Sequence, residues 1–324
     1  MKALILAPFA PIALERLRRR MTVIYEPWTE TRSLRDPAEL AVRLAEEGIE
    51  VVVAEVDFFF DEVFEDPSPL SFIGLCRQAT NQIDMEAAAK RGVAVVNTPG
   101  RNANAVAELV IGLALSLMRR IPAANAYVHS GSWDHPMAAY TDMRGAELAG
   151  RTMGIVGMGA IGRRVARLAR GLGMHVLGHD PYASGLGYVT MTTLEGLLAG
   201  SHVVTLHVPE TPETIGMLGP DRLALMPPGS CFINTASAAL VDEAALVEAL
   251  RSGRLAGAGL DVFETHPIIP NSPLLKLDNV LLTPHVGGAT AETVERYSRA
   301  ITRALLRFEG AVRRDRRAAA TGSS

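Results

Sequence analysis

A glycine pattern typical of dinucleotide sites is the clearest chemical signal in this sequence. Gly157, Gly159 and Gly162 lie in the segment GIVGMGAIGRRVA, which follows an apolar strand pattern and opens a helical one. The first glycine allows a tight turn, the second lets the backbone approach a pyrophosphate, and the third lets the helix pack on the sheet. The amino end of the helix offers N–H groups and a positive dipole to the phosphates. The pattern therefore predicts a nucleotide site at this turn.

An acidic residue indicates which dinucleotide would bind. Asp180 ends the next strand pattern, about 20 residues after the glycines, where a carboxylate accepts hydrogen bonds from the adenosine ribose. The same carboxylate would repel a 2′-phosphate, so NAD is favoured over NADP. The alternative interpretation is a glycine turn without a ligand, in which Asp180 only caps a helix or turn. The order of strand, turn, helix, strand and acid favours the nucleotide site.

Two alternating series of strand and helix patterns must position these residues. In the first hundred residues, strand patterns such as 51–56 and 70–75 alternate with helical patterns such as 36–48. A second series runs from residue 152 to 286, and a last helical pattern covers about 290–309. This alternation predicts parallel sheets covered by helices. We expect two α/β domains, with a boundary near residue 100 and the last helix returning to the first domain.

Composition excludes several classes of partner. The 324 residues are enough for two hydrophobic cores, and a net charge of -3 gives no sign of nucleic acid or an anionic membrane as partner. No apolar run reaches the roughly 18 residues of a membrane span. The two cysteines, Cys76 and Cys231, lie in separate apolar runs and indicate a reducing compartment, the cytoplasm. We expect no metal site, and a disordered tail over residues 311–324.

With these features in place, the chain resembles the D-isomer-specific 2-hydroxyacid dehydrogenases, the family that includes phosphoglycerate dehydrogenase and glyoxylate reductase. The resemblance extends from about residue 40 to residue 305. The segments that carry it are NQIDMEAAAKRGVAVVNTPG, VAELVIGLALSLMRRI, GRTMGIVGMGAIGRRVA, LHVPETPETIGML, INTASAALVDEAALVEAL, GAGLDVFETHP and NVLLTPHVGGAT.

The resemblance implies a fold and a domain organisation. A flavodoxin-like substrate domain would be built from residues 1–99 and 286–310, and a Rossmann NAD-binding domain would be inserted as residues 100–285. The active site would lie in the cleft. The helix after residue 100 would contribute to a homodimer, although the very apolar stretch 105–117 could equally be buried within one chain.

The resemblance also implies an activity and a set of cofactor contacts. The chemistry would be NAD-dependent interconversion of a 2-hydroxy acid and a 2-keto acid, both small molecules. Residue by residue, the implied cofactor contacts are Gln78, Ala160, Ile161, Asp180, Val208, Thr235, Ala236, Ser237, Asp261 and His285.

The chain keeps one of the three catalytic side chains that the resemblance implies. His285 in TPHVGG matches the family histidine that donates a proton to the carbonyl; the alternative is a structural histidine after a strand. A carboxylate should raise the pKa of that histidine, but His266 stands in its place. An arginine should hold the substrate carboxylate, but Ser237 stands there.

These departures lead to two hypotheses. Arg77, which follows an apolar strand in the segment CRQATNQID, would replace the missing arginine; the alternative is a solvated surface arginine. His266 would contact His285 and orient it without lending a negative charge, so we expect a lower pH optimum for reduction than in family members with the carboxylate.

Two functions remain open on the sequence. The first is an NAD-dependent dehydrogenase or reductase with a rearranged catalytic triad, which His285 and the arginine-bearing loop favour. The second is a catalytically weak or inactive NAD-binding sensor or scaffold on the same fold, which the paired departures at Ser237 and His266 favour.

Overall fold

The computed structural model describes residues 1–65, 68–183 and 186–321, and the chain divides into two compact units. Unit 1 comprises Met1–Arg101 and Thr290–Ser324, and unit 2 comprises Asn102–Ala289. The sequence analysis expected boundaries at 99/100 and 285/286. Unit 2 therefore contains the glycine turn together with Ser237, His266 and His285, while Arg77 belongs to unit 1.

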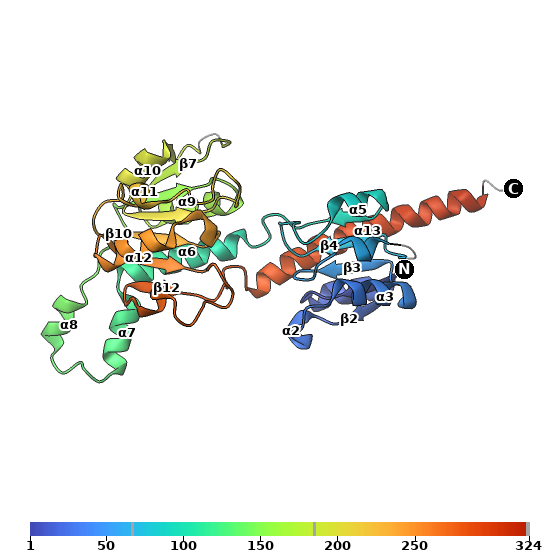
Figure 1. Cartoon of the computed structure of the whole chain (residues 1–324), viewed down its shortest axis with the longest axis horizontal. Coiled ribbons are helices and arrows are strands. Elements are labelled where there is room, and N and C mark those ends of the chain that lie inside the picture. Colours follow the sequence, from blue (N-terminus) through green and yellow to red (C-terminus); the bar gives the residue numbers. More distant parts are fainter. Residues whose placement is uncertain (66–67, 184–185, 322–324) are drawn as a thin grey trace. The chain divides into compact units, whose positions relative to one another are not determined.

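Unit 1 is a five-stranded parallel sheet with helices on it (Figure 1). Its strand order, β2-β1-β3-β4-β5, is the flavodoxin-like order, which confirms the expected fold of this unit. The strands are β1 Lys2–Ile5, β2 Thr22–Tyr25, β3 Val51–Ala54, β4 Phe72–Leu75 and β5 Ala94–Val96. The helices are α1 Pro11–Arg18, α2 Trp28–Thr31, α3 Pro37–Glu47, α4 Asp61–Phe64, α5 Met85–Lys90 and α13 Ala291–Thr321.

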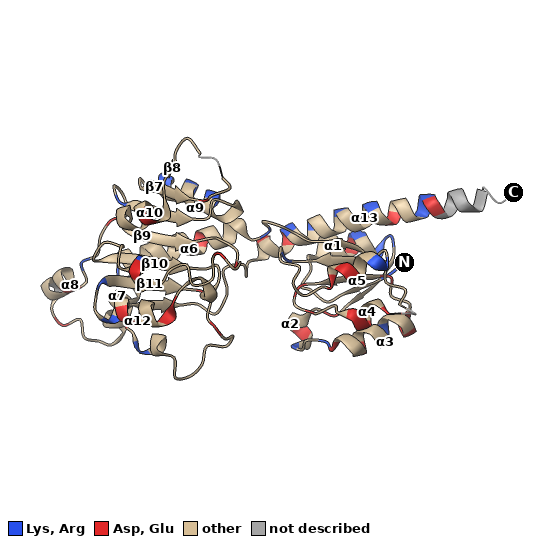
Figure 2. Cartoon of the chain, turned by 45° about the horizontal axis from the view of Figure 1, so that its top comes forward, with Lys and Arg blue, Asp and Glu red and all other residues tan. Residues whose placement is uncertain are grey.

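The last helix completes the core of unit 1. Tyr297, Ile301 and Leu305 of α13 are buried in the same hydrophobic cluster as Ile5 of β1. A Cβ atom on Gly74 of β4 would lie 2.8 Å from Ile301, so a glycine is needed for this close packing. Over residues 292–315, the polar positions of α13 carry charges of both signs (Figure 2). The helix continues to Thr321, where the sequence analysis expected a disordered tail from residue 311; residues 322–324 lie outside the described residues.

Unit 2 is a seven-stranded parallel sheet in the order β12-β11-β10-β9-β6-β7-β8. The strands are β6 Thr152–Val156, β7 His175–His179, β8 Thr190–Met191, β9 Val203–Leu206, β10 Ser230–Asn234, β11 Leu255–Leu260 and β12 Val280–Leu282. The helices are α6 Ala103–Met118, α7 Ile121–His129, α8 Pro136–Asp142, α9 Ala160–Gly171, α10 Leu194–Gly200, α11 Pro220–Leu223 and α12 Glu243–Arg251, with 3₁₀ turns η1 Ala238–Leu240 and η2 Pro273–Lys276.

The strand order of unit 2 locates its ligand edge. The chain starts at β6 and builds outward through β7 and β8, then crosses back to β9 on the other side of β6. This reversal is the topological switch point of the Rossmann fold, and ligands bind outside the carboxyl ends of the strands there. The expected Rossmann unit, inserted between two segments of a flavodoxin-like unit, is thus confirmed.

The apolar helix after residue 100 is buried within unit 2. Helix α6 packs on α9, β10 and β11, and Val106, Val110 and Leu113 are among its buried residues. One face of this helix is therefore buried within the chain, while Glu108 and Gly112 are exposed.

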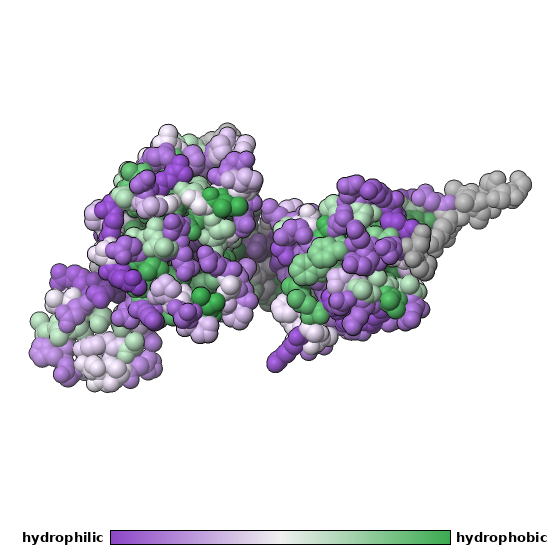
Figure 3. Space-filling model, viewed as in Figure 1, coloured by the Kyte–Doolittle hydropathy of each residue, from purple (hydrophilic) through white to green (hydrophobic). Residues whose placement is uncertain are grey.

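Helices α7 and α8 form an arm that extends from the rest of unit 2 (Figure 1). Figure 3 shows apolar surface among polar atoms on this arm. Its exposed large apolar side chains are Ile121, Val128, Trp133, Met137 and Tyr140.

Two further expectations concern the surroundings of the protein. Among the described residues, the search for a helix long and apolar enough to cross a membrane finds none. Both cysteines, Cys76 and Cys231, are buried free thiols.

Candidate active site

The residues singled out in unit 2 lie in consecutive loops at the carboxyl ends of neighbouring strands. Parallel strands place all these loops at one edge of the sheet. From β7 to β12 across the sheet, the loops carry Asp180, then Gly157 to Gly162, then Val208 and Glu210, then Thr235 to Ser237, then Asp261 and His266, and finally His285.

The glycine turn has the shape that a dinucleotide requires. Gly157 has φ +93°, and a Cβ atom on it would lie 2.6 Å from the carbonyl oxygen of His207. A Cβ on Gly162 would collide with the carbonyl oxygen of Gly157. At Gly159, in contrast, nothing lies within 4 Å of an added Cβ. Protein packing therefore explains the first and third glycines, and the open space at Gly159 fits the approach of a pyrophosphate.

The start of α9 is open to an anion. Gly159 is its N-cap, no side chain caps the helix, and its first turn, which contains Ala160 and Ile161, has no acidic residue. The unpaired N–H groups of a helix amino end attract phosphate. These residues therefore fit the phosphates of NAD.

Asp180 organises the turn. Its Oδ2 accepts a hydrogen bond from Met158 N at 2.8 Å, and its Oδ1 accepts one from Tyr182 N at 2.8 Å. The capping role that the sequence left open is thus present. Each carboxylate oxygen has a second lone pair, so these bonds leave acceptor capacity for a ribose hydroxyl.

The residues after β9 and β10 flank the turn. A Cβ on Gly157 would lie 2.9 Å from Val208, so this side chain packs against the turn. His207 is neutral, because burial lowers its pKa to about 3, and its Nε2 lies 3.1 Å from Thr205 Oγ1. The buried hydroxyl of Thr235 has no hydrogen-bond partner in the described part of the chain. Ala236 N donates to Asn234 Oδ1 at 3.0 Å.

A buried carboxylate shapes the loop that carries His285. Asp261 is 1% exposed, and it accepts hydrogen bonds from Thr283 Oγ1 at 2.6 Å, Val286 N at 2.9 Å and Gly287 N at 2.8 Å. His285 lies between these donors with φ +56°, a left-handed conformation that a non-glycine residue rarely adopts. The three hydrogen bonds to Asp261 hold the backbone in this conformation.

The two histidines are in contact, as the sequence hypothesis expected. His285 Nδ1 lies 3.2 Å from His266 Nε2, and the ring centroids are 5.0 Å apart. Only one of these two nitrogens carries the proton, so one imidazole donates to the other. The contact fixes the ring of His285 and uses its Nδ1.

Ser237 bonds to a carboxylate that sequence reasoning missed. Its Oγ donates to Glu210 Oε2 at 2.8 Å, and it accepts from Ala239 N at 3.2 Å. Its backbone oxygen accepts from Asn234 Nδ2 at 2.7 Å. The position at which the resemblance expected an arginine is therefore occupied by a serine bonded to an acid.

Arg77 lies two residues after β4 in unit 1 and is half-buried. Its pKa is lowered, first by burial and then by the nearby charge of Arg101. Arg101 is itself paired with Glu55 at 2.8 Å and lies over the ring of Tyr297. In the described part of the chain, Arg77 forms no ion pair.

A cavity of about 650 Å³ in unit 1 includes Arg77. The other residues that line it are Trp28, Thr29, Arg32, Ser33, Leu34, Val56 and Phe58. Arg77 therefore faces a hollow large enough for a small molecule. Gln78 also lies in unit 1, is exposed, and accepts a hydrogen bond from Asn97 Nδ2 at its backbone oxygen, 2.6 Å away.

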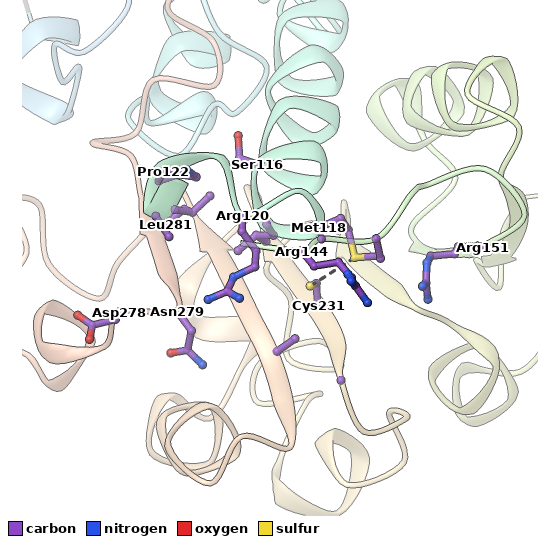
Figure 4. A pocket seen from close by; sticks show the side chains of 16 residues that line it. Ser116, Met118, Arg120, Pro122, Arg144, Arg151, Cys231, Asp278, Asn279 and Leu281 are labelled. Carbon is purple, nitrogen blue, oxygen red and sulfur yellow. Dashed lines mark hydrogen bonds between the residues drawn. The ribbon is translucent and has the colours of Figure 1, made fainter. Parts of the chain in front are cut away.

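A second cavity, of about 660 Å³, lies at the opposite edge of the unit 2 sheet. Arg151, Gly229 and Asn279 line it, and each stands at the amino end of a strand. Figure 4 shows Arg120, Arg144 and Arg151 around this cavity with the contact between Met118 and Cys231. Because dinucleotides bind at carboxyl ends, this cavity is not the cofactor site.

Comparison with known proteins decides the family. The family model described as D-isomer specific 2-hydroxyacid dehydrogenase, NAD binding domain, matches residues 111–287. The chain belongs to this family. It is therefore an NAD-dependent oxidoreductase that acts on CH–OH donors. The dehydrogenase contains no group of three His, Cys, Asp or Glu residues that could hold a metal ion, within the residues described.

Individual relatives agree with this assignment. The dehydrogenase is 42% identical to the glyoxylate reductase of Korarchaeum cryptofilum over 76% of either chain. It is 43% identical to the D-3-phosphoglycerate dehydrogenase of Escherichia coli, over 76% of this chain and 61% of that protein. The solved structure of the TT0316 protein from Thermus thermophilus has a TM-score of 0.82 and 39% identity, covering 93% of this chain and 94% of that one.

The glycine turn generates a prediction with a matched pair of variants. In Gly159→Ala the new methyl group points into open space, so the free energy of unfolding should stay within about 0.5 kcal/mol of wild type. The same methyl group blocks the pyrophosphate, so NADH should bind at least about tenfold more weakly. Gly162→Ala should instead lower the free energy of unfolding by about 1–3 kcal/mol, because its methyl group meets backbone. Denaturant unfolding and NADH titration measure both effects; wild-type affinity in Gly159→Ala contradicts the assignment.

The histidine pair generates a second prediction. Reduction requires a protonated imidazole, and a carboxylate beside His285 Nδ1 would stabilise that form. In His266→Glu, the pH at which reduction falls to half its maximum should therefore rise by about one unit or more. His266→Asn, which adds no charge, is the matched control and should keep the wild-type profile. The measurement is the pH profile of kcat/KM for a 2-keto acid, and identical profiles in both variants would show that position 266 does not act on His285.

Proposed function

We propose that this dehydrogenase interconverts a small 2-hydroxy acid and a 2-keto acid by hydride transfer, with a non-standard catalytic triad. The observation that supports this most strongly is the contact between His285 and His266. His285 lies on a loop that is fixed by Asp261, and this loop is at the same edge of the sheet as the glycine turn. An imidazole held at the ligand edge of a Rossmann sheet is suited to proton exchange with a carbonyl or hydroxyl group.

Within unit 2, some residues would bind the cofactor and another would transfer the proton. When bound, NAD accepts the hydride in oxidation, and NADH supplies it in reduction. The turn from Gly157 to Gly162 would hold the pyrophosphate, and Asp180 would hold the adenosine ribose. His285 would donate a proton to the carbonyl oxygen in reduction and remove it in oxidation. The further proposed cofactor contacts are Gln78, Val208, Thr235, Ala236 and Asp261.

We propose Arg77 as the group that binds the substrate carboxylate. Loss of one partner of a buried charged pair costs about 2–5 kcal/mol, which corresponds to roughly 30-fold to several thousand-fold in rate. Because Ser237 cannot supply a positive charge, another cation is needed. Arg77 is half-buried beside a cavity. The acid that interacts electrostatically with Arg77 is Glu55, and Glu55 is already paired with Arg101.

The second candidate is a sensor or scaffold that binds NADH without turnover. The bond between Ser237 and Glu210 favours it, since an acid at this position opposes an anionic substrate. Incubation with NADH and a panel of 2-keto acids, glyoxylate and hydroxypyruvate included, distinguishes the dehydrogenase from the sensor or scaffold. NADH binding without oxidation across the panel and across about pH 5–9 would support the sensor.

The assembly and location are also proposed. The exposed apolar side chains of the α7–α8 arm, among them Trp133, Met137 and Tyr140, support a homodimer in which this arm is covered. Sedimentation of the protein tests this, and a monomer at micromolar concentration would contradict it. The two free thiols, Cys76 and Cys231, support a reducing compartment such as the cytoplasm.

The role of Arg77 is tested by substitution. In Arg77→Ala the KM for a 2-keto acid should rise at least about tenfold, because a charge-assisted hydrogen bond to the carboxylate is lost. The affinity for NADH, measured by direct titration, should stay at the wild-type value. Arg16→Ala, which removes an exposed arginine of α1, is the control for the change in net charge. If KM does not move in Arg77→Ala, the assignment of this residue is wrong.

A further inference from the structure

Three arginines line the cavity at the amino edge of the unit 2 sheet (Figure 4). Arg120 and Arg144 stand at the two ends of the α7–α8 arm, and Arg151 stands directly before β6. Asp278 is the one acid among the described residues that line this cavity. The lining thus contains three guanidinium groups and one carboxyl group, an excess of cationic side chains.

The backbone brings the two ends of the arm together. Ala146 N donates a hydrogen bond to the carbonyl oxygen of Met118 at 2.7 Å. A Cβ atom on Gly145 would lie 2.5 Å from the same oxygen, so a glycine is needed for this close approach. The approach places Arg120 and Arg144 at one cavity, although the whole arm separates them in the sequence.

The three arginines are not neutralised by acids. In the described part of the chain, none of them forms an ion pair. Arg120 Nη1 donates to the backbone oxygen of Asp142 at 2.5 Å, and Arg151 Nε donates to the backbone oxygen of Glu147 at 2.9 Å. A guanidinium has five N–H donors, so each of these bonds to a neutral carbonyl leaves donors and the full positive charge for a ligand.

The third guanidinium contacts an aromatic ring. The Cζ atom of Arg144 lies 5.6 Å from the centre of the Tyr140 ring. A ring contacts the flat side of a guanidinium, whereas the N–H donors lie at its edge. This contact therefore orients Arg144 without using the donors that would bind an anion.

The charge of Arg151 extends to the buried floor of the cavity. Cys231, which lines the cavity, is 2% exposed, and its Sγ lies 3.8 Å from Sδ of Met118. Burial raises the pKa of the Cys231 thiol to about 11, and the positive charge of Arg151 acts in the opposite direction. An anion in this cavity would thus meet a positive charge that solvent screens less than on an open surface.

The size of the cavity indicates how large the ligand is. Its volume of about 660 Å³ lies within the range of small-molecule sites and far exceeds a single phosphate ion. Pro122 and Ala123 of the first turn of α7 also line it, and this turn has no acidic residue. A helix amino end attracts anions, so it adds to the effect of the arginines.

We propose that this cavity binds a small molecule with two or more anionic groups, phosphate or carboxylate, through Arg120, Arg144 and Arg151. Arginine binds both groups through paired charge-assisted hydrogen bonds. The site is separate from the proposed function, because the glycine turn lies at the opposite edge of the sheet. A ligand that joins both ends of the arm to β6 would also stabilise the folded protein.

Calorimetry with the full-length protein tests this site, with inorganic pyrophosphate and citrate as probes. NADH is present at saturating concentration, so that the glycine turn is occupied. At least one probe should bind wild type, and the tighter of the two identifies phosphate or carboxylate as the preferred group. Arg144→Gln and Arg151→Gln should each weaken this binding at least about fivefold, and the double variant at least about 25-fold, because separate contacts add.

Matched variants separate position from net charge. Arg167→Gln removes an exposed arginine of α9 that does not line the cavity, and it should keep the wild-type affinity. Arg151→Lys keeps the charge and should retain more affinity than Arg151→Gln does. Binding that persists in the double variant, or that is lost in Arg77→Gln instead, places the anion elsewhere and overturns the proposal.

Thermal unfolding distinguishes a lost contact from a lost fold. The better probe should raise the Tm of wild type and of Arg167→Gln, but not that of the double variant, whose Tm without probe should stay close to wild type. An equal rise of Tm in all three proteins contradicts the proposal. If neither probe binds and the double variant changes the sedimentation of the protein, a second copy of the chain covers the cavity and the anion site is wrong.

Discussion

One buried carboxylate, Asp261, holds the conformation of the loop that carries His285. Asp261 accepts hydrogen bonds from the hydroxyl of Thr283 and from the backbone N–H groups of Val286 and Gly287. A buried charge is tolerated only when it is fully hydrogen-bonded, so this loop cannot relax without leaving the carboxylate unsatisfied. The left-handed backbone of His285 and its contact with His266 both depend on this arrangement.

The positive groups expected to meet ligand anions are unevenly distributed. At the carboxyl edge of the unit 2 sheet they are backbone N–H groups at the start of α9, which suit the phosphates of the cofactor. The loops after β9, β10, β11 and β12, residues 207–219, 235–242, 261–272 and 283–289, together contain acids and no lysine or arginine. Arg77 in unit 1 is a half-buried guanidinium beside a cavity. The chain thus has the glycine turn of a dinucleotide site. Under the proposed function, it differs from the resembled family pattern in the charges that would meet the substrate.

Much of the fold was predictable because its signals are local. The glycine turn, Asp180 and the alternation of apolar strands with helices each lie within a short segment, and the structure confirms the Rossmann and flavodoxin-like units. The contact between His266 and His285 followed from the resemblance. The bond between Glu210 and Ser237 was not predicted, because the two residues are 27 positions apart and only the pairing of β9 with β10 brings them together. The absence of lysine and arginine from the surrounding loops was a signal in the sequence that could have indicated it. Residues 313–321 contain arginine and alanine, which favour helices, but no large apolar side chain that would mark a buried face, and the length of α13 was accordingly underestimated.

The most direct test of this account is a crystal structure of the protein with NAD and oxamate. The account predicts that the loop held by Asp261 keeps the conformation described, and that Nε2 of His285 lies about 3 Å from the oxygen on C2 of oxamate. An imidazole turned away from oxamate, or a cofactor that does not cross the glycine turn at Gly159, would contradict it.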